Sequence, residues 1–170
     1  TGSKNSSEFA INHIVDGLAI APYFEKEKKI MDVGSGSGIP GIVLSIMCPS
    51  SRVVLLEPRV RRVRFLEQVR IELELSKLKV VRSKVEDLAA KSNHSDYTLV
   101  TRAFGDMAKF GRLIKSFCSS VSKIYFLKAT VKPSEIDEAE RILGESQVIK
   151  LDVPGYSRRC LVLFDKSKVG

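Results

Sequence analysis

The sequence contains few cysteines and no metal-binding pattern. Its three cysteines, Cys48, Cys118 and Cys160, are widely spaced, and no C-x-x-C or H-x-x-x-H pairing occurs in the 170 residues. A disulfide framework needs paired cysteines, and a zinc site needs clustered thiolate or imidazole ligands. We therefore expect no metal site, and cysteines that serve as small apolar side chains in a reducing compartment.

Long apolar runs are also missing, although 44% of the residues are hydrophobic. No run approaches the roughly 20 residues that span a bilayer, and no secretory signal is evident. We expect a cytoplasmic monomer without a membrane partner, folded as a single domain over residues 9–170. The chain begins at Thr1, and residues 1–8 are expected to be a tail that is disordered or foreign to the natural protein.

Four glycines within eight residues are the most informative pattern. A short buried strand at residues 30–33 ends in these glycines, and a helix-compatible segment with Pro40 in its first turn follows to Met47. The glycines are Gly34, Gly36, Gly38 and Gly41. A strand, a tight turn and a helix N-terminus in this order typically bind a nucleotide-like ligand.

Two acidic residues discriminate between the ligands that such a turn can hold. The turn fits the G-x-G-x-x-G pattern of NAD-binding proteins. Glu57 lies 21 residues after Gly36, where such proteins have an acid that binds the ribose. Asp32, however, would face the pyrophosphate, and like charges repel there by about 1 kcal/mol or more. S-adenosylmethionine carries a sulfonium and an ammonium group instead. The pattern therefore favours a methyl donor, with Asp32 facing its cations, Glu57 on the ribose, and Val85 and Glu86 beside the adenine.

Periodicity and breaker residues predict that strands and helices alternate along the chain. The predicted strands are residues 30–33, Arg52–Glu57, Leu78–Val81, Tyr97–Val100, Lys123–Leu127, Gln147–Val153 and Cys160–Phe164. The predicted helices are Phe9–Phe24, Ile42–Met47, Val60–Leu75, Met107–Phe117 and Pro133–Leu143, with a short turn or helix at Val85–Ala90. We expect an α/β fold with a doubly wound, mostly parallel seven-stranded sheet. The last two strands, joined by Pro154-Gly155 without a helix, should form an antiparallel edge hairpin.

Positive charge is concentrated in one segment. Residues 52–84 hold ten basic and four acidic residues, and the whole chain has a net charge of +8. Arg59, Arg61, Arg62 and Arg64 crowd the first turns of a predicted helix, where the helix dipole disfavours cations by about 0.3 to 1 kcal/mol each. Because arginine binds phosphate through paired N–H groups, the cluster indicates an RNA partner, with a solvated basic face as the alternative.

Several segments together resemble the RsmG (GidB) family of methyltransferases. They are Asp32-Val-Gly-Ser-Gly-Ser-Gly-Ile-Pro-Gly41, Leu56-Glu57, Arg61-Arg62-Val63-Arg64-Phe65-Leu66, Val85-Glu86 and Thr101-Arg102-Ala103-Phe104, with a weaker likeness at His13–Leu18, Leu127-Lys128 and Val153-Pro154. The resemblance implies a class I, Rossmann-like enzyme that methylates N7 of a guanine in 16S rRNA. The implied donor is S-adenosylmethionine, the product is S-adenosylhomocysteine, and the partner is 16S rRNA or the 30S subunit.

The resemblance also implies roles for individual residues. The donor-site positions are Gly34, Ile39, Val85, Glu86 and Arg102, and Glu57 takes the place of the acidic ribose ligand, beside Asp32, Gly36 and Gly38 of the turn. The expected RNA contacts are Arg59, Arg61, Arg62, Arg64, Lys128 and Arg159. The chain departs from the family pattern at Asn12, Gly17, Ala129 and Cys160, and most of the family's N-terminal helical segment is expected to be absent ahead of Ser7.

Guanine N7 has an exposed lone pair, so its methylation needs no general base, and catalysis rests on alignment of the reactants. We expect Arg102 to position donor or guanine, with an ion pair to Asp106 as its alternative role. Lys128 is expected to meet RNA phosphate or solvent, and His13 and Asp16 to form a surface pair on the first helix. Three other functions remain open: a non-catalytic RNA-binding module, an NAD-dependent oxidoreductase, and a methyltransferase for a small molecule.

Overall fold

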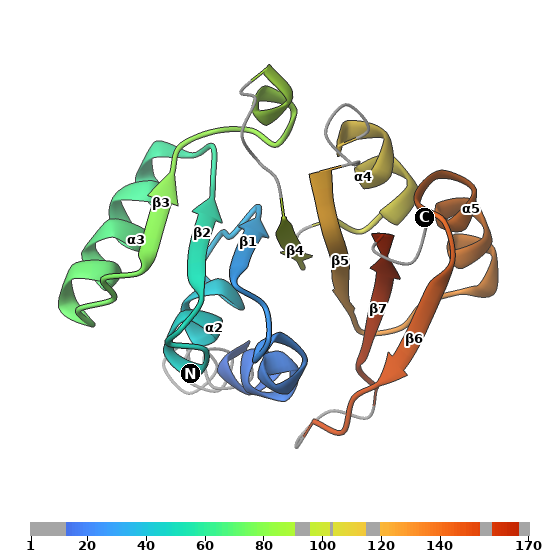
Figure 1. Cartoon of the computed structure of the whole chain (residues 1–170), viewed down its shortest axis with the longest axis horizontal. Helices are drawn as coiled ribbons and strands as arrows, with labels where there is room; N and C mark the ends of the chain where they lie inside the picture. Colours follow the sequence, from blue (N-terminus) through green and yellow to red (C-terminus); the bar gives the residue numbers. More distant parts are fainter. Residues whose placement is uncertain (1–12, 91–95, 103, 115–119, 154–157, 167–170) are drawn as a thin grey trace, which may run out of the picture.

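A computed structural model describes residues 13–90, 96–102, 104–114, 120–153 and 158–166 of the chain. Seven strands form one sheet in the order β3-β2-β1-β4-β5-β7-β6 (Figure 1). Their bounds are β1 Lys29–Val33, β2 Arg52–Leu56, β3 Leu78–Val81, β4 Tyr97–Thr101, β5 Val121–Lys128, β6 Ser146–Lys150 and β7 Cys160–Asp165. β1 to β5 pair in parallel, whereas β7 is antiparallel to both β5 and β6. The predicted doubly wound sheet with an antiparallel edge hairpin is confirmed.

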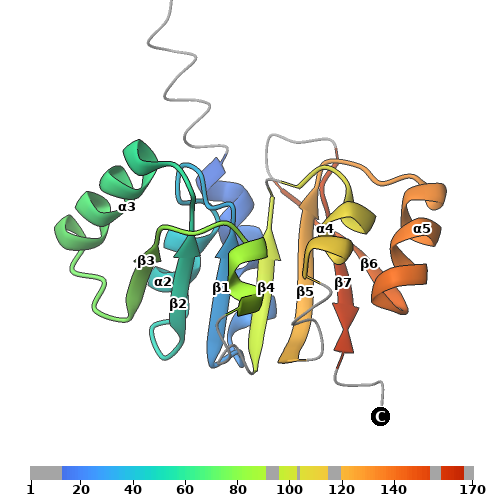
Figure 2. The ribbon, with the colours of Figure 1, turned by 90° about the horizontal axis from the view of Figure 1, so that it is seen from above.

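Helices cover both faces of the sheet. They are the α-helical residues 13–20, the 3-10 helix η1 Ala21–Phe24, α2 Gly41–Met47, α3 Val60–Glu72, the 3-10 helix η2 Glu86–Ala90, α4 Met107–Ile114 and α5 Pro133–Leu143. One core cluster joins η1, α2 and α3 to one face, and the other joins η2, α4 and α5 to the opposite face. Figure 2 shows η2 and α4 in front of the sheet and α2 behind it. In the described residues, no helix is long and apolar enough to cross a membrane.

Several predicted boundaries are wrong by a few residues, each for a local reason. The first helix changes to 3-10 geometry at Ala21, one residue before Pro22, because proline has no N–H to continue the α-helical ladder. α3 ends at Glu72 rather than Leu75, and Glu74 adopts a positive φ of 52° just beyond it. β6 stops at Lys150, where its pairing with Cys160 ends. Residues 1–12, 115–119 and the turn at 154–155, on which predictions were made, lie outside the described residues.

The described cysteines behave as expected for apolar side chains. Cys48 and Cys160 are free thiols, and each is at most 7% exposed. Burial raises the pKa of both thiols, which disfavours the reactive thiolate. Cys118 lies outside the described residues. Within those residues, no group of three or more His, Cys, Asp and Glu side chains could hold a metal ion.

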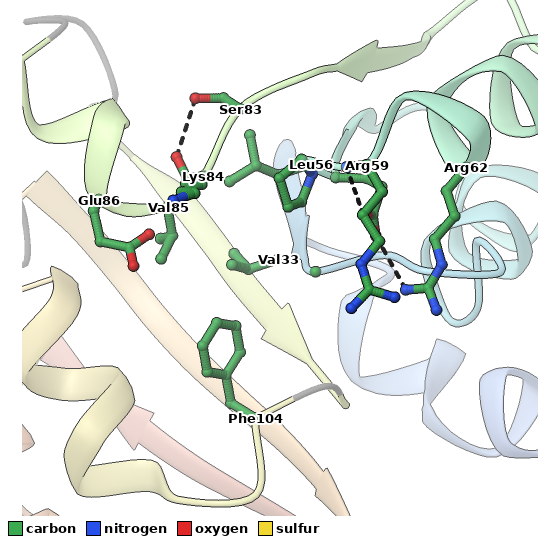
Figure 3. A pocket seen from close by; sticks show the side chains of 12 residues that line it. Val33, Leu56, Arg59, Arg62, Ser83, Lys84, Val85, Glu86 and Phe104 are labelled. Carbon is green, nitrogen blue, oxygen red and sulfur yellow. Dashed lines mark hydrogen bonds and ion pairs between the residues drawn. The ribbon is translucent and has the colours of Figure 1, made fainter.

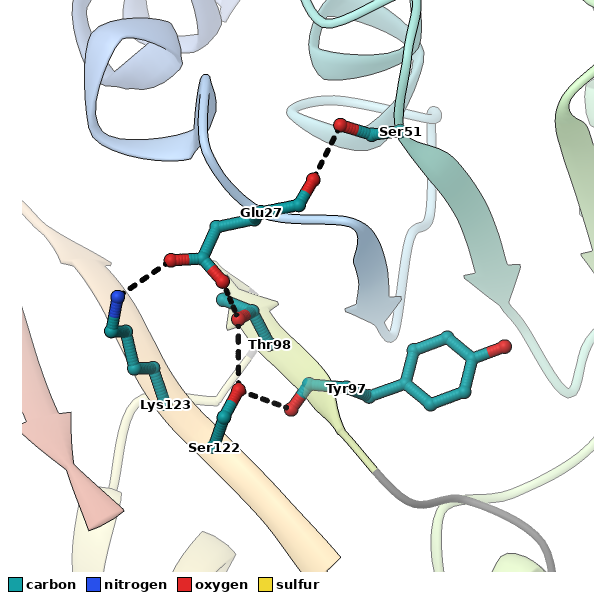
Figure 4. A network of polar contacts seen from close by, with 6 residues as sticks. All are labelled: Glu27, Ser51, Tyr97, Thr98, Ser122 and Lys123. Carbon is teal, nitrogen blue, oxygen red and sulfur yellow. Dashed lines mark hydrogen bonds and ion pairs between the residues drawn. The ribbon is translucent and has the colours of Figure 1, made fainter. Parts of the chain in front are cut away.

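A polar network around Glu27 joins three segments at the amino ends of the strands (Figure 4). The Glu27 carboxylate accepts hydrogen bonds from Thr98 Oγ1 on β4 and from Lys123 Nζ on β5, the latter at 2.7 Å. Ser51 Oγ, just before β2, donates to the Glu27 carbonyl at 2.6 Å. This network fixes the entry to β1 against β4 and β5, at the sheet edge opposite to the glycine turn.

The outermost helices carry opposite charge. α3 contains four arginines and two glutamates, whereas α5 contains four acidic residues and one arginine. The two helices lie at opposite ends of the sheet (Figure 1). A basic helix therefore lies beside β2 and β3, and an acidic helix lies at the far end of the sheet.

Candidate functional site

The glycine turn is shaped by close packing as much as by backbone conformation. Gly38 has a φ of 92°, a conformation that L side chains rarely adopt. At Gly41, a Cβ atom would lie 2.2 Å from Leu55 Cδ2 and 2.8 Å from Asp32 Oδ2. These contacts let the start of α2 lie directly against β1 and β2.

Asp32 lies beneath this turn. Alternation along β1 puts Ile30 and Asp32 on the α2 face of the sheet. Asp32 is only 1% exposed there. Its Oδ2 accepts a hydrogen bond of 3.0 Å from the Gly41 N–H, the first residue of α2. Burial raises the pKa of the Asp32 carboxyl to about 7, against the lowering effect of the Gly41 bond. The side chain is not part of the lining of the cleft described next, and its role toward the ligand's cations stays a prediction.

A cleft of about 330 Å³, here called the β1–β2 cleft, opens at the carboxyl ends of the first strands (Figure 3). Its lining includes Val33, Gly34, Glu57, Arg59, Arg62, Ser83, Lys84, Val85, Glu86 and Phe104. In parallel α/β sheets, ligands bind outside the carboxyl ends of the strands, near the point where strand order reverses. That point lies between β1 and β4 in this sheet, so the cleft occupies the expected place.

Glu57 is held rigidly at the edge of the cleft. Its residue is 2% exposed, and its carboxylate accepts hydrogen bonds from Gly36 N at 3.0 Å and from Arg59 N at 2.9 Å. Arg62 Nη1 lies 3.6 Å from Glu57 Oε2. These contacts tie the glycine turn to the start of α3. They also bring Arg59 and Arg62, predicted as RNA contacts, to the lining of this cleft.

A second pocket of about 400 Å³, here called the β4–β5 pocket, adjoins the first. Its lining includes His13, Asp16, Arg102, Phe104, Lys128 and Arg159. Phe104 lines both cavities and packs edge-on against Phe110 of α4, with ring centroids 4.8 Å apart. The two cavities are therefore neighbours that share Phe104 in their lining.

A buried carboxylate organises the β4–β5 pocket. Asp16 is 2% exposed, with Oδ1 at 2.9 Å from Arg159 Nε and Oδ2 at 3.7 Å from Arg102 Nη1. Arg102 Nη1 also donates to His13 Nδ1 at 2.6 Å. Since arginine cannot accept a hydrogen bond, this imidazole is neutral, and burial followed by the Arg102 charge lowers its pKa. The expectation of a surface pair is wrong in its placement, because Asp16 is buried and neutralises two arginines from distant segments.

The other residues for which a role was predicted lie in several different places. Lys128 donates to Glu135 and to the Gly105 carbonyl, so the expectation of a solvated lysine is wrong. Asp106 accepts from the Lys109 N–H at 2.8 Å at the start of α4, and Arg102 pairs with Asp16 in its place. Gly36, Gly38 and Ile39 shape the turn but are not part of the β1–β2 cleft lining. Arg61 and Arg64 are exposed on α3.

Sequence reasoning missed several residues of the two cavities. Ser83, Lys84 and Phe104 line the β1–β2 cleft, and His13 and Asp16 line the β4–β5 pocket. The loop after β3 was recognisable, because residues after a parallel strand join the ligand-binding edge of the sheet. The partners of Asp16 could not be recognised from the sequence, because Arg159 lies 143 residues after Asp16 in the chain.

Comparison with known proteins matches residues 1–163 to the GidB family, described as rRNA small subunit methyltransferase G. Ribosomal RNA small subunit methyltransferase G of Shigella flexneri is 33% identical over 170 residues, which cover 99% of this chain and 81% of that protein. The protein of the same name from Escherichia coli (strain K12 / DH10B) is 32% identical, with the same coverage.

Solved structures show the same fold at low sequence identity. The S-adenosylmethionine-dependent methyltransferase SibL in its apo form has a TM-score of 0.69 at 13% identity, covering 89% of this chain and 54% of SibL. The N-terminal domain of EvdMO1 with S-adenosylhomocysteine bound has a TM-score of 0.66 at 14% identity, covering 89% of this chain and 80% of that domain's chain. The strand order, the family match and these likenesses agree, and the NAD-dependent oxidoreductase alternative is wrong. The chain belongs to the GidB family, rRNA small subunit methyltransferase G, and is an S-adenosylmethionine-dependent rRNA methyltransferase of class I fold.

Proposed function

We propose that the chain methylates N7 of a guanine in 16S rRNA with the donor in the β1–β2 cleft and the guanine in the β4–β5 pocket. The observation that carries this assignment is the shared wall at Phe104, which places two cavities side by side at the carboxyl edge of the sheet. Methyl transfer needs two ligands in contact and in line, and adjoining cavities meet that requirement. We propose that the chain acts as a monomer and without a metal.

The β1–β2 cleft fits the adenosine part of the donor. Its volume lies at the lower end of the range for ligand pockets, about 300 to 1,000 Å³. Val33, Val85 and Phe104 provide apolar surfaces for a flat base. The Glu57 carboxylate can accept about four hydrogen bonds, and two of these positions accept from backbone N–H groups. The other positions can accept from ribose hydroxyls. Glu86, exposed at the start of η2, is placed at the far side of the cleft beside Val85.

When bound, S-adenosylmethionine supplies an electrophilic methyl group, and the protein's task is to align guanine N7 with it. Arg102 stands at the end of β4 with N–H groups beyond those that contact His13 and Asp16. We assign it a hydrogen bond to guanine O6. A bidentate arginine bond to O6 and N7, which is common in guanine recognition, would occupy the lone pair that must react.

The arginines and Lys128 divide into three groups in this proposal. Arg59 and Arg62 border the β1–β2 cleft, and Lys128 and Arg159 are already paired with Glu135 and Asp16. Arg61 and Arg64 are exposed, and among the described residues neither has an ion-pair partner. The exposed pair is therefore proposed to contact the RNA backbone, with Lys128 and Arg159 placed where the guanine enters.

Titration calorimetry and methyl transfer test the function together. We expect S-adenosylhomocysteine to bind, and labelled methyl to appear at guanine N7 of deproteinised 16S rRNA or of 30S subunits. Glu57→Gln should weaken S-adenosylhomocysteine binding about 10-fold, because one charge-assisted acceptor is lost. Glu138→Gln, an exposed carboxylate on α5, is the matched control and should bind as the wild type does. Absence of binding, or transfer only to a small molecule, would contradict the proposal.

Reversing the charge of Arg61 and Arg64 should weaken RNA binding in a salt-dependent way. For Arg61→Glu with Arg64→Glu, the slope of log affinity against log salt should fall by about one to two units, since each phosphate contact releases counterions. Affinity for S-adenosylhomocysteine should stay unchanged. Lys132→Glu with Arg141→Glu, two exposed cations at α5, is the charge-matched control. If the two double variants had equal slopes of log affinity against log salt, Arg61 and Arg64 would belong to a solvated basic face that does not contact RNA.

A further inference from the structure

An exposed aromatic ring interrupts the basic surface of α3. The side chain of Phe65 is 52% exposed, whereas its neighbour Leu66 is fully buried against the sheet. Exposure alone does not distinguish Phe65, because Ile71 on the same helix is 61% exposed, but Phe65 is an exposed aromatic residue that lies beside arginines. An exposed ring beside exposed arginines offers a flat apolar surface and positive charge together, a combination that suits a ligand carrying both a ring and an anion.

The surroundings of Phe65 indicate which ligand. Arg61 lies one helical turn before it, and Arg64 directly before it. Helical side chains lean toward the N-terminus, so the ring leans toward Arg61 and the end of α3 that borders the β1–β2 cleft at Arg62. α3 has no acidic residue in its first turn, where the helix dipole would favour one. An apolar protein segment placed here would desolvate these arginines, whereas a nucleotide offers a flat base to the ring and a phosphate to the guanidinium groups.

We infer that Phe65, Arg61 and Arg64 form a docking surface for an unpaired nucleotide of the rRNA substrate, distinct from the guanine that is methylated. The base stacks on the Phe65 ring, and the adjoining phosphates meet Arg61 and Arg64. This rests on the proposed rRNA substrate. It adds a second point of attachment, which orients the RNA strand across the cleft mouth.

Three replacements of Phe65 separate stacking from simple apolar contact. Phe65→Ala should raise the KM for rRNA between about 5-fold and 150-fold, the range for losing one base–aromatic stack. Phe65→Leu should resemble Phe65→Ala because it keeps apolar volume without a π face, and Phe65→Trp should resemble the wild type. The salt slope and the affinity for S-adenosylhomocysteine should not change in any of them. Ile71→Ala, which alters a 61% exposed apolar residue on the same helix, is the control and should leave KM unchanged.

Two results would overturn the inference. An unchanged KM in Phe65→Ala would show that no base rests on the ring. Full activity of Phe65→Leu alongside a defective Phe65→Ala would assign Phe65 to a simple apolar contact and exclude base stacking. Failure of the proposed function is distinguishable, because then the wild type itself would transfer no methyl group to rRNA.

Discussion

Replacing Asp16 by alanine is expected to lower the free energy of unfolding by about 3 to 5 kcal/mol, the usual cost of breaking a buried ion pair from one side. The reason is that Arg102 and Arg159, with side chains only 28% and 17% exposed, would lose their shared counter-charge. Urea denaturation measures this loss. Methyl transfer by the folded fraction should fall by about 100-fold or more, because Arg102 loses its fixed position.

Asp16→Asn separates charge from shape in this cluster. It keeps an oxygen that can accept from Arg159 or Arg102, yet leaves two cations beside a base that becomes positively charged on N7 methylation. We therefore expect kcat to fall more than KM rises. Glu138→Ala, which breaks the exposed 2.8 Å pair with Arg112, should cost less than about 1 kcal/mol. Equal costs for Asp16→Ala and Glu138→Ala would contradict the burial argument.

Replacing Gly41 by alanine is expected to have the second largest effect. The added methyl group would lie 2.2 Å from Leu55 Cδ2 and within 3 Å of both Asp32 Oδ2 and Asp32 Cβ. Relief requires α2 to move away from β1, which also breaks the hydrogen bond from the Gly41 N–H to Asp32. We expect a loss of about 2 to 4 kcal/mol in unfolding free energy and no measurable binding of S-adenosylhomocysteine.

Gly105→Ala is the matched control for stability. A Cβ atom at Gly105 meets no atom within 4 Å, and its φ is not in the left-handed region. Its free energy of unfolding should stay within about 0.5 kcal/mol of the wild type. If Gly41→Ala were as stable as Gly105→Ala, the turn would be free to shift, and its close packing would not explain the glycine.

The fold was predictable because its signals are local. Alternation of apolar runs and breakers located every described strand, and the helix-free connection between the last two strands identified the antiparallel edge. The place of the site followed from the same pattern, since the glycine turn and Glu57 both end parallel strands. Even the face of the sheet on which Asp32 lies could have been predicted from the strand pattern. The two-residue period of β1 puts it with Ile30 under α2, although the charge argument pointed it toward the ligand.

The polar contacts were not predictable in the same way. His13 and Asp16 look like ordinary helix decoration at their spacing, and only the folded chain brings Arg102 and Arg159 to them. Likewise, the spacing of the arginines on α3 does not tell that Arg62 turns toward Glu57 while Arg61 and Arg64 remain exposed. Such long-range pairings depend on strand order and helix placement.

The opposite charges of α3 and α5 act before any contact is made. The arginine-rich α3 and the acidic α5 lie at opposite ends of the sheet (Figure 1), so these two helices contribute an electric dipole along the sheet. A polyanion turns such a dipole as the protein diffuses toward it, and oriented encounters raise association rates. We therefore expect the protein to approach the ribosomal RNA with α3 and the mouth of its cleft foremost and with α5 on the far side.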